Sequence, residues 1–88
     1  MSGEKILIVE DNFIELTVLQ SDLEKKGYRC LTASDGVEAL DKLGKESVDL
    51  IISDQNMPGM GGLDLLQEVK NRFDDLPFIM LTREGSIN

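Results

Sequence analysis

Three carboxylates stand where apolar runs of the sequence end. Asp54 closes a run that begins at Leu50, and Glu10 and Asp11 directly follow the run Ile6–Val9. If both runs are parallel strands, these side chains meet at the carboxyl edge of one sheet, where open α/β sheets place their ligands. Crowded carboxylates repel one another and favour a divalent cation, and a set of oxygen ligands suits Mg²⁺ or Mn²⁺ rather than zinc. The pattern therefore predicts a metal site at Glu10, Asp11 and Asp54.

Four short β-prone runs predict the sheet that would position this site. The segments between the runs are each long enough for one helix, as parallel crossovers require. Three of the runs show little alternation of apolar and polar residues, so we expect both faces of the sheet to be covered. The chain therefore reads as β-α-β-α-β-α-β, with strands at Ile6–Val9, Tyr28–Ala33, Leu50–Ser53 and Phe78–Leu81.

Helix signals lie between these runs. Asn12 with Glu15, and Asp35 with Glu38, have the spacing of capping boxes. Apolar residues follow at helical spacing, and a glycine ends each of the first two segments. We expect the first helix to carry Phe13, Leu16, Leu19 and Leu23 before Gly27, the second to carry Val37, Leu40 and Leu43 before Gly44, and the third, from near Gly62, to bury Leu63, Leu66, Val69 and Phe73.

Composition narrows the class of protein. We expect residues 1–88 to form one small domain, because no linker, repeat or change of composition divides them. A net charge of −8 argues against nucleic acid and anionic membranes as direct partners. No apolar stretch approaches the roughly 20 residues of a membrane span, and the first residues lack a signal sequence. We therefore expect a cytoplasmic protein.

Histidine is absent from the sequence, and cysteine occurs once, as Cys30. A single cysteine forms no internal disulfide, and Cys30 lies inside the second predicted strand, where a small buried apolar side chain is its expected role. The absence of histidine excludes Ser-His-Asp and Cys-His catalysis and any histidine-ligated metal. Any chemistry must therefore be carboxylate chemistry.

Four motifs in order along the whole chain resemble the receiver domain of two-component response regulators. The resemblance implies a flavodoxin-like α/β fold with a parallel sheet of order 2-1-3-4. The stretch from Ile52 to Leu66 is most similar to chemotaxis-type single-domain regulators. The motifs lie in the stretches Ile8–Asn12, Ile52–Leu63 and Ile79–Thr82, each at the end of a predicted strand.

The resemblance also implies a role for each site residue. Asp54 would be the phosphoacceptor that takes a phosphoryl group from the phosphohistidine of a histidine kinase. Asp11 and Asp54 would ligate Mg²⁺ directly, Glu10 through water, and Asn56 through its main-chain carbonyl. Thr82 would donate a hydrogen bond to a phosphoryl oxygen. Such a domain is not an enzyme beyond its own phosphorylation and dephosphorylation.

The sequence departs from the family pattern after Thr82. Family members continue with a fourth helix, a fifth strand that ends in a lysine, and a fifth helix, whereas only Arg83–Asn88 follow here. We therefore expect a receiver domain truncated after its fourth strand, with impaired phosphorylation. Arg83 stands where the family has a small residue, and Gly61 replaces a common acidic residue. The first would crowd the phosphoryl pocket or place a cation there.

Other functions fit the residues less well. The segment from Asp54 begins like an EF-hand loop, but Pro58 is no side-chain ligand and Leu65 occupies the position of the bidentate glutamate. A phosphatase of the haloacid dehalogenase type is a distant alternative, because Asn56 stands where its acid/base aspartate is expected. The main alternative is a self-associating structural fragment with no competent phosphorylation site. In either case we expect a homodimer, because the fourth strand would be an open edge.

Overall fold

Four parallel strands alternate with three helices along the chain. The computed structural model describes residues 3–82, so the expectations for Arg83–Asn88 lie outside the described residues. Each strand begins and ends within one residue of its predicted bounds. The elements are β1 (Lys5–Val9), α1 (Phe13–Lys25), β2 (Arg29–Ala33), α2 (Gly36–Leu43), β3 (Leu50–Asp54), α3 (Gly62–Arg72) and β4 (Phe78–Leu81).

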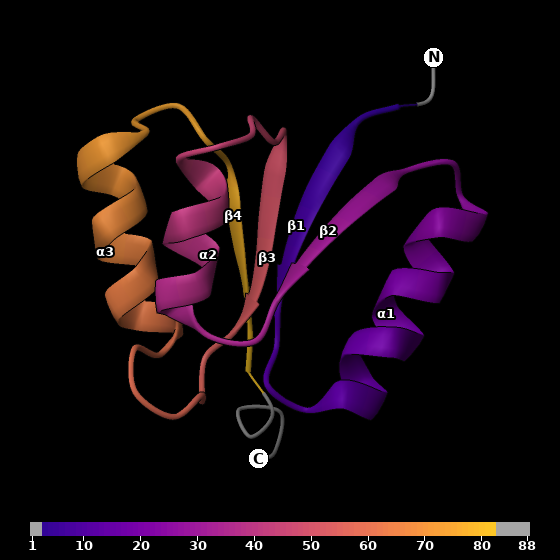
Figure 1. Cartoon of the computed structure of the whole chain (residues 1–88), viewed down its shortest axis with the longest axis horizontal. Helices are drawn as coiled ribbons and strands as arrows, with labels where there is room; N and C mark the ends of the chain where they lie inside the picture. Colours follow the sequence, from indigo (N-terminus) through magenta and orange to yellow (C-terminus); the bar gives the residue numbers. More distant parts are fainter. Residues whose placement is uncertain (1–2, 83–88) are drawn as a thin grey trace.

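The strand order β2-β1-β3-β4 confirms the predicted 2-1-3-4 sheet of a flavodoxin-like fold. Helices α2 and α3 lie on one side of the sheet and α1 lies on the other (Figure 1). In register, Val9 stands beside Ser53, and Asp54 stands beside Leu81. The residues at the carboxyl ends of β1, β3 and β4 therefore meet at one edge of the sheet. This edge includes the topological switch point between β1 and β3, where the strand order reverses.

Side-chain caps begin the first two helices as predicted. Asn12 accepts a hydrogen bond from the Glu15 N–H at 3.0 Å, and Asp35 accepts one from the Glu38 N–H at 2.8 Å. The second cap is extended by Ser34, whose N–H and hydroxyl both donate to the Glu38 carboxylate. These bonds hold the pKa of Glu38 below its ordinary value, the Ser34 N–H being the largest cause. The bonds fix how each loop enters its helix.

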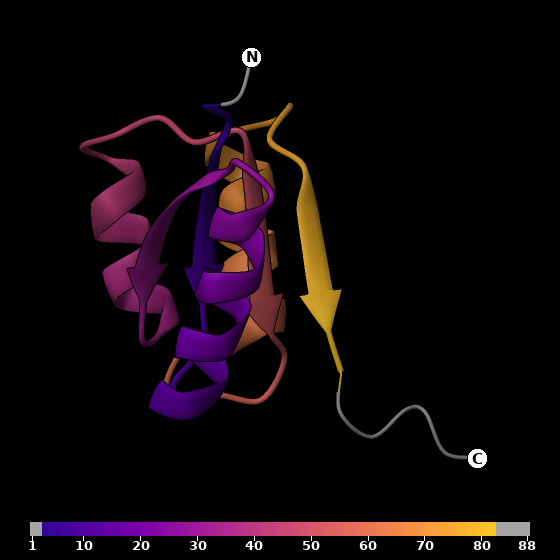
Figure 2. The same ribbon diagram turned by 90° about the vertical axis from the view of Figure 1, so that its right-hand side faces the viewer.

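The core has one cluster on each face of the sheet. Leu7, Val9 and Ile51 face α2 and α3, whereas Ile6, Ile8 and Ile52 face α1. Strands β1 and β3 are buried on both faces, which confirms the expectation from their apolar runs. Strand β4 alternates instead, with Ile79 47% exposed and Leu81 41% exposed. Cover on both faces therefore holds for β1 and β3 but not for β4, which among the described residues forms the expected open edge of the sheet (Figure 2).

The buried face of α3 differs from the prediction. Leu63 is 58% exposed, whereas Leu65 is fully buried and Val69 nearly so. Leu66 and Phe73 are half-buried. The cause lies at the start of the helix, where Gly62 is pressed against the end of β3, so the residues three and seven positions later face the core. Leu63 is one residue out of phase and turns toward solvent.

Cys30 lies on β2 and is half-buried against the cluster that faces α1. Burial is the main cause that raises the pKa of its thiol, and the nearby Glu24 carboxylate adds to it. A raised thiol pKa leaves less of the reactive thiolate at neutral pH. Packing is therefore the role that the surroundings of Cys30 support.

Candidate functional site

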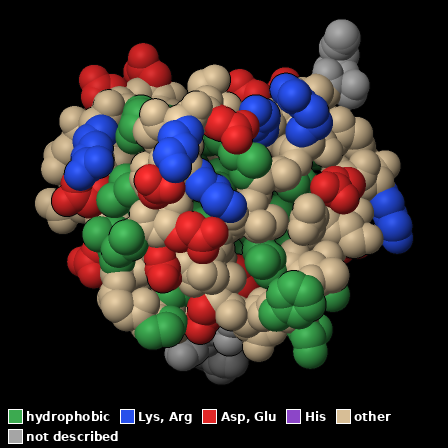
Figure 3. Space-filling view, viewed as in Figure 1, with side chains coloured by type: hydrophobic (Ala, Val, Ile, Leu, Met, Phe, Trp, Pro, Cys, Tyr) green, Lys and Arg blue, Asp and Glu red, His purple; other side chains and the backbone are tan. Residues whose placement is uncertain are grey.

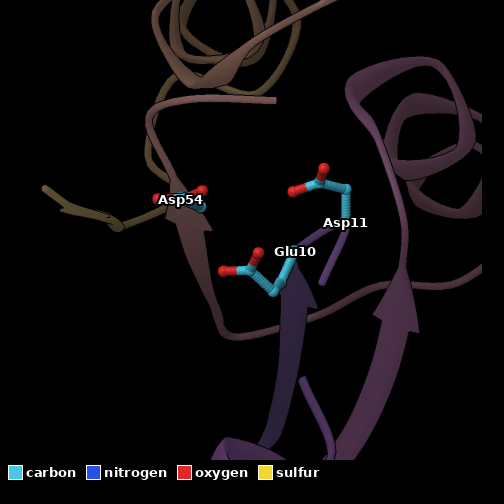
Figure 4. A group of neighbouring side chains, drawn as sticks. All are labelled: Glu10, Asp11 and Asp54. Carbon is cyan, nitrogen blue, oxygen red and sulfur yellow. The ribbon is translucent and has the colours of Figure 1, made fainter. Parts of the chain in front are cut away.

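The three predicted carboxylates come together at the carboxyl edge of the sheet. Asp54 is the last residue of β3, and Glu10 and Asp11 follow β1. One oxygen from each carboxylate lies within 4.8 Å of the other two. Figure 4 shows the three side chains gathered between the ends of the two strands. Neighbouring parallel strands in register explain how residues more than forty positions apart meet here.

Burial differs among these side chains. Asp54 is 2% exposed and Glu10 is 6% exposed, whereas Asp11 is exposed. Burial raises the pKa of Glu10, and repulsion from Asp54 adds to the shift, while a hydrogen bond from the Asn12 N–H at 3.0 Å opposes it. Burial beside Asp54 thus makes the ionised form of Glu10 unfavourable without a cation.

The pKa of Glu10 predicts a pH-dependent effect of Glu10→Gln on the metal-free protein. Below the ordinary value of 4.5, Glu10 is protonated in both folded and unfolded states. As the pH rises through 4.5 toward the higher folded pKa, the unfolded state loses its proton first, so the wild-type protein loses stability. Glutamine carries no proton to lose and can still accept the Asn12 N–H. We therefore expect Glu10→Gln to become increasingly stabilising between acidic and neutral pH.

Urea unfolding in a metal chelator, repeated across that pH range, measures this difference. Glu4→Gln is a matched control because it makes the same chemical change at an exposed residue before β1. A difference between Glu10→Gln and the wild type that shrank with rising pH would contradict the assigned direction.

The donor set fits a hard divalent cation. All three groups are carboxylates, and Mg²⁺ takes oxygen ligands at about 2.1 Å, which places opposite ligands about 4.2 Å apart. The oxygens here lie within 4.8 Å of one another, so only a small inward movement brings them to ligand distance. Their negative charge would be neutralised by the ion. The residues therefore fit Mg²⁺, and the geometry supports the metal ligands predicted from the sequence.

Two further predicted site residues lie at the same edge. Asn56 is exposed in the loop two residues beyond Asp54. Thr82 is exposed and directly follows Leu81, the register partner of Asp54. The Gln55 N–H donates to the Leu81 carbonyl at 3.0 Å and so ties the two strand ends together. The ligand role of Asn56 and the phosphoryl contact of Thr82 stay predictions.

Sequence reasoning missed how closely Gly62 approaches the site. A Cβ atom on Gly62 would lie 2.5 Å from the main-chain oxygen of Asp54 and 2.7 Å from Met80 Sδ. The Gly62 N–H also donates to the Gln55 carbonyl at 3.0 Å. Only a glycine therefore lets α3 begin directly against the residue that carries the site. The close approach depends on three elements, so the sequence pattern showed Gly62 only as a helix start.

Residues 6–88 match the family described as "Response regulator receiver domain". The chain belongs to this family. A receiver domain is regulatory rather than catalytic, which agrees with the expectation from the sequence.

Known receiver domains share both the sequence and the fold. The chain is 42% identical over 77 residues to the sensor histidine kinase RcsC of Salmonella typhimurium, covering 88% of the chain but only 8% of RcsC. The chemotaxis response regulator CheY4 of Vibrio cholerae superposes with a TM-score of 0.91 at 38% identity, covering 97% of this chain and 72% of CheY4.

A third relative was solved with a metal. The response regulator TrrA from Thermotoga maritima, in complex with Mg²⁺-BeF, superposes with a TM-score of 0.87 at 37% identity, covering 90% of this chain and 69% of TrrA. The receiver fold found here therefore occurs in a protein whose structure contains Mg²⁺.

Proposed function

We propose that this receiver domain accepts a phosphoryl group on Asp54 from the phosphohistidine of a histidine kinase, with Mg²⁺ bound beside it. The observation that carries the proposal is the buried carboxylate of Asp54, held at a strand end within 4.8 Å of Glu10 and Asp11. The Mg²⁺-BeF complex of TrrA supports the metal, and the likeness to RcsC, a sensor histidine kinase, supports the donor.

In this proposal an oxygen of Asp54 forms a bond to phosphorus while the bond from phosphorus to the histidine nitrogen breaks. The product is an acyl phosphate on Asp54 and a free histidine on the kinase. Asp11 and Asp54 would ligate the ion directly, Glu10 through water, and Asn56 through its main-chain carbonyl; Mn²⁺ can substitute for Mg²⁺. The bound ion supplies positive charge that offsets charge on the transferring group. The Thr82 hydroxyl would donate to a phosphoryl oxygen.

Exposed apolar side chains beside the site suit a protein as phosphodonor. Phe13 is 76% exposed, Ile14 is 72% exposed and Val18 is 56% exposed, all in the first half of α1. The helix begins two residues after Asp11, so these side chains adjoin the carboxylates. Figure 3 shows apolar side chains gathered on this part of the surface. A contiguous apolar surface next to a reactive group is typical of a docking site.

A cytoplasmic location, expected from the composition, belongs to the same proposal. In the part of the chain that the structure describes, the helices are too short and too polar to cross a bilayer. The likeness to CheY4 makes chemotaxis-type signalling our first expectation for the output. Any reaction of the domain itself would be limited to its own phosphorylation and dephosphorylation.

We expect the 88-residue polypeptide to be phosphorylated poorly. Residues 1–88 contain no lysine beyond Lys70, so a polypeptide made of these residues alone has no counterpart of the strand-five lysine that the family resemblance implies. One electrostatic partner of a reacting group often contributes about 3 kcal/mol to a transition state. Incubation with acetyl phosphate and Mg²⁺ should leave an acid-stable, base-labile adduct on only a small fraction of the chains. Mass spectrometry of the intact protein measures that fraction.

Two controls distinguish weak phosphorylation of Asp54 from none. The adduct should disappear in Asp54→Asn and when a chelator replaces Mg²⁺. An adduct that persists in Asp54→Asn would refute Asp54 as the phosphoacceptor. A stoichiometric, long-lived adduct on Asp54 would show instead that the missing lysine is dispensable, or that Arg83 replaces it.

A second candidate function is self-association of the 88-residue polypeptide as a homodimer. The observation that favours it is strand β4, which among the described residues pairs with β3 alone and exposes Ile79 and Leu81. Beside it, a shallow groove on the α1 side of the sheet is lined by Ile6, Ile52 and Ile79. An apolar strand edge without charge is a template for pairing with another chain. Both functions can belong to one polypeptide.

A further inference from the structure

We propose that Gly36 of α2 and Met60 form a contact that positions the loop carrying Asn56, so that both are positioning residues for the metal site. The site loop is defined here as Gln55–Gly61, which joins Asp54 to α3. The inference rests on the proposed metal site and adds residues that lie outside the carboxylate cluster. Gly36 follows β2 in the chain, whereas the carboxylates follow β1 and end β3.

The contact leaves no space for a side chain on Gly36. A Cβ atom placed there would lie 2.6 Å from Met60 Cγ, 2.7 Å from Met60 Sδ and 3.0 Å from Met60 Cβ. Contacts below 3.0 Å require something to move. The two shortest contacts involve Met60 Cγ and Sδ, which belong to a half-buried side chain packed against the core. The contact at Met60 Cβ, at 3.0 Å, needs a shift of only a few tenths of an ångström, so Met60→Ala removes most of the clash. An added methyl group would therefore push on the site loop itself.

Lack of space for a side chain, rather than an unusual backbone conformation, explains why residue 36 is a glycine. The described glycines with positive φ are Gly3, Gly27 and Gly59, and Gly36 is not among them. As the first residue of α2 it has a conformation that alanine adopts easily, and alanine is the better helix former. The three atoms nearest to an added Cβ all belong to the Met60 side chain. The contact can therefore be tested by shortening the Met60 side chain.

Hydrogen bonds tie the same region to both halves of the site. The Gly36 N–H donates to the Met60 carbonyl at 3.3 Å, and the Glu10 N–H donates to the Ala33 carbonyl at 3.0 Å. The end of β2 therefore contacts the residue after β1, and the start of α2 contacts the loop after β3. At its far end the site loop is closed by the bond from Gly62 to Gln55. Because Met60 is part of this closed loop, a shift of Met60 should also shift the rest of the loop.

The test compares wild type, Gly36→Ala, Met60→Ala and the double variant. Binding of Mn²⁺ alone is followed through the electron paramagnetic resonance signal of the free ion. We expect Gly36→Ala to weaken Mn²⁺ binding about tenfold, the lower range for groups that support metal ligands without touching the ion. In the Met60→Ala background the same change should have almost no effect. Gly44→Ala is the matched control, because its Cβ would meet only ordinary contacts of 3.5 Å or more.

A second measurement, on the metal-free protein, keeps the inference separate from the proposed function. Backbone amide shifts of the site loop should move in Gly36→Ala and return toward those of Met60→Ala in the double variant. If wild type binds no Mn²⁺, the proposed metal site fails, while these shifts still decide whether the contact positions the loop. A loop whose amides do not respond to Gly36→Ala would overturn the inference.

The remaining outcomes are also decisive. Mn²⁺ affinity that stays unchanged in Gly36→Ala, with altered unfolding alone, would show a packing role and overturn the inference. Weakened binding that persists in the Met60→Ala background would do the same. Should Gly36→Ala unfold the chain, a folded double variant supports the contact, and an unfolded double variant contradicts it.

Discussion

Asp11→Asn should abolish detectable Mg²⁺ and Mn²⁺ binding and, at the same time, make the metal-free protein slightly more stable. Asp11 is the exposed member of the three clustered carboxylates. Its neutralisation removes a charged ligand from the ion, and a cation that prefers carboxylate oxygens binds weakly to the two that remain. Without metal, the same change removes repulsion among three acids within 4.8 Å of one another. Opposite effects on the two states distinguish a metal site from solvated carboxylates.

Paramagnetic broadening of backbone amides by Mn²⁺ measures the binding. In the wild-type protein the amides near Glu10, Asp11 and Asp54 should broaden first, and in Asp11→Asn they should stay sharp. Asp22→Asn makes the same charge change at an exposed position of α1 and should leave the broadening as in wild type. Selective broadening around Asp54 that survives in Asp11→Asn would refute the ligand assignment.

Urea unfolding in a chelator measures the other half of the prediction. The gain in the free energy of unfolding should be on the order of 1 kcal/mol or less, because Asp11 is exposed and its interactions are screened by water and salt. Addition of Mg²⁺ should then stabilise the wild type and leave Asp11→Asn unchanged, since only the former binds the ion. Loss of stability in the metal-free variant would show that Asp11 has a structural role instead.

Ile79→Lys should convert a self-associating 88-residue polypeptide into a monomer or unfold it. Ile79 is 47% exposed on β4 and lines the apolar groove on the α1 side of the sheet. The segment Phe78–Leu81 contains no charged residue, so nothing in it opposes the approach of a second strand. A lysine there places a charge where the partner strand would pair. The net charge of −8 opposes association only modestly, because salt screens charges beyond roughly 8 Å.

Sedimentation velocity across a hundredfold range of concentration tests the idea. Wild type should shift from monomer toward dimer, and Ile79→Lys should not. Val37→Lys is a suitable control, since Val37 is also apolar and exposed, at 64%, but lies on α2 away from β4. A wild-type protein that remains a folded monomer at the highest concentration would contradict the second candidate function and leave the metal site unaffected.

Local patterns in the sequence were sufficient for the element order and for the three carboxylates. The apolar runs of β1 and β3 give way to the acidic residues Glu10 and Asp54, and this change marks the carboxyl end of each strand. The caps at Asn12 and Asp35 depend on residues three positions apart, so they too are visible in the sequence. Such signals act over short distances along the chain, and tertiary packing confirmed them here.

Packing between distant elements decided what these patterns could not. The close approach of Gly62 to Asp54 rotates α3 so that Leu65 rather than Leu63 is buried. The contact of Gly36 with Met60 joins the start of α2 to the site loop. The alternating exposure of β4 likewise depends on which elements lie against it, because an apolar run reads the same at the centre and at the edge of a sheet. Sequence alone therefore predicted which three carboxylates cluster at the sheet edge, whereas the three-dimensional contacts determined which surfaces hold those residues in place.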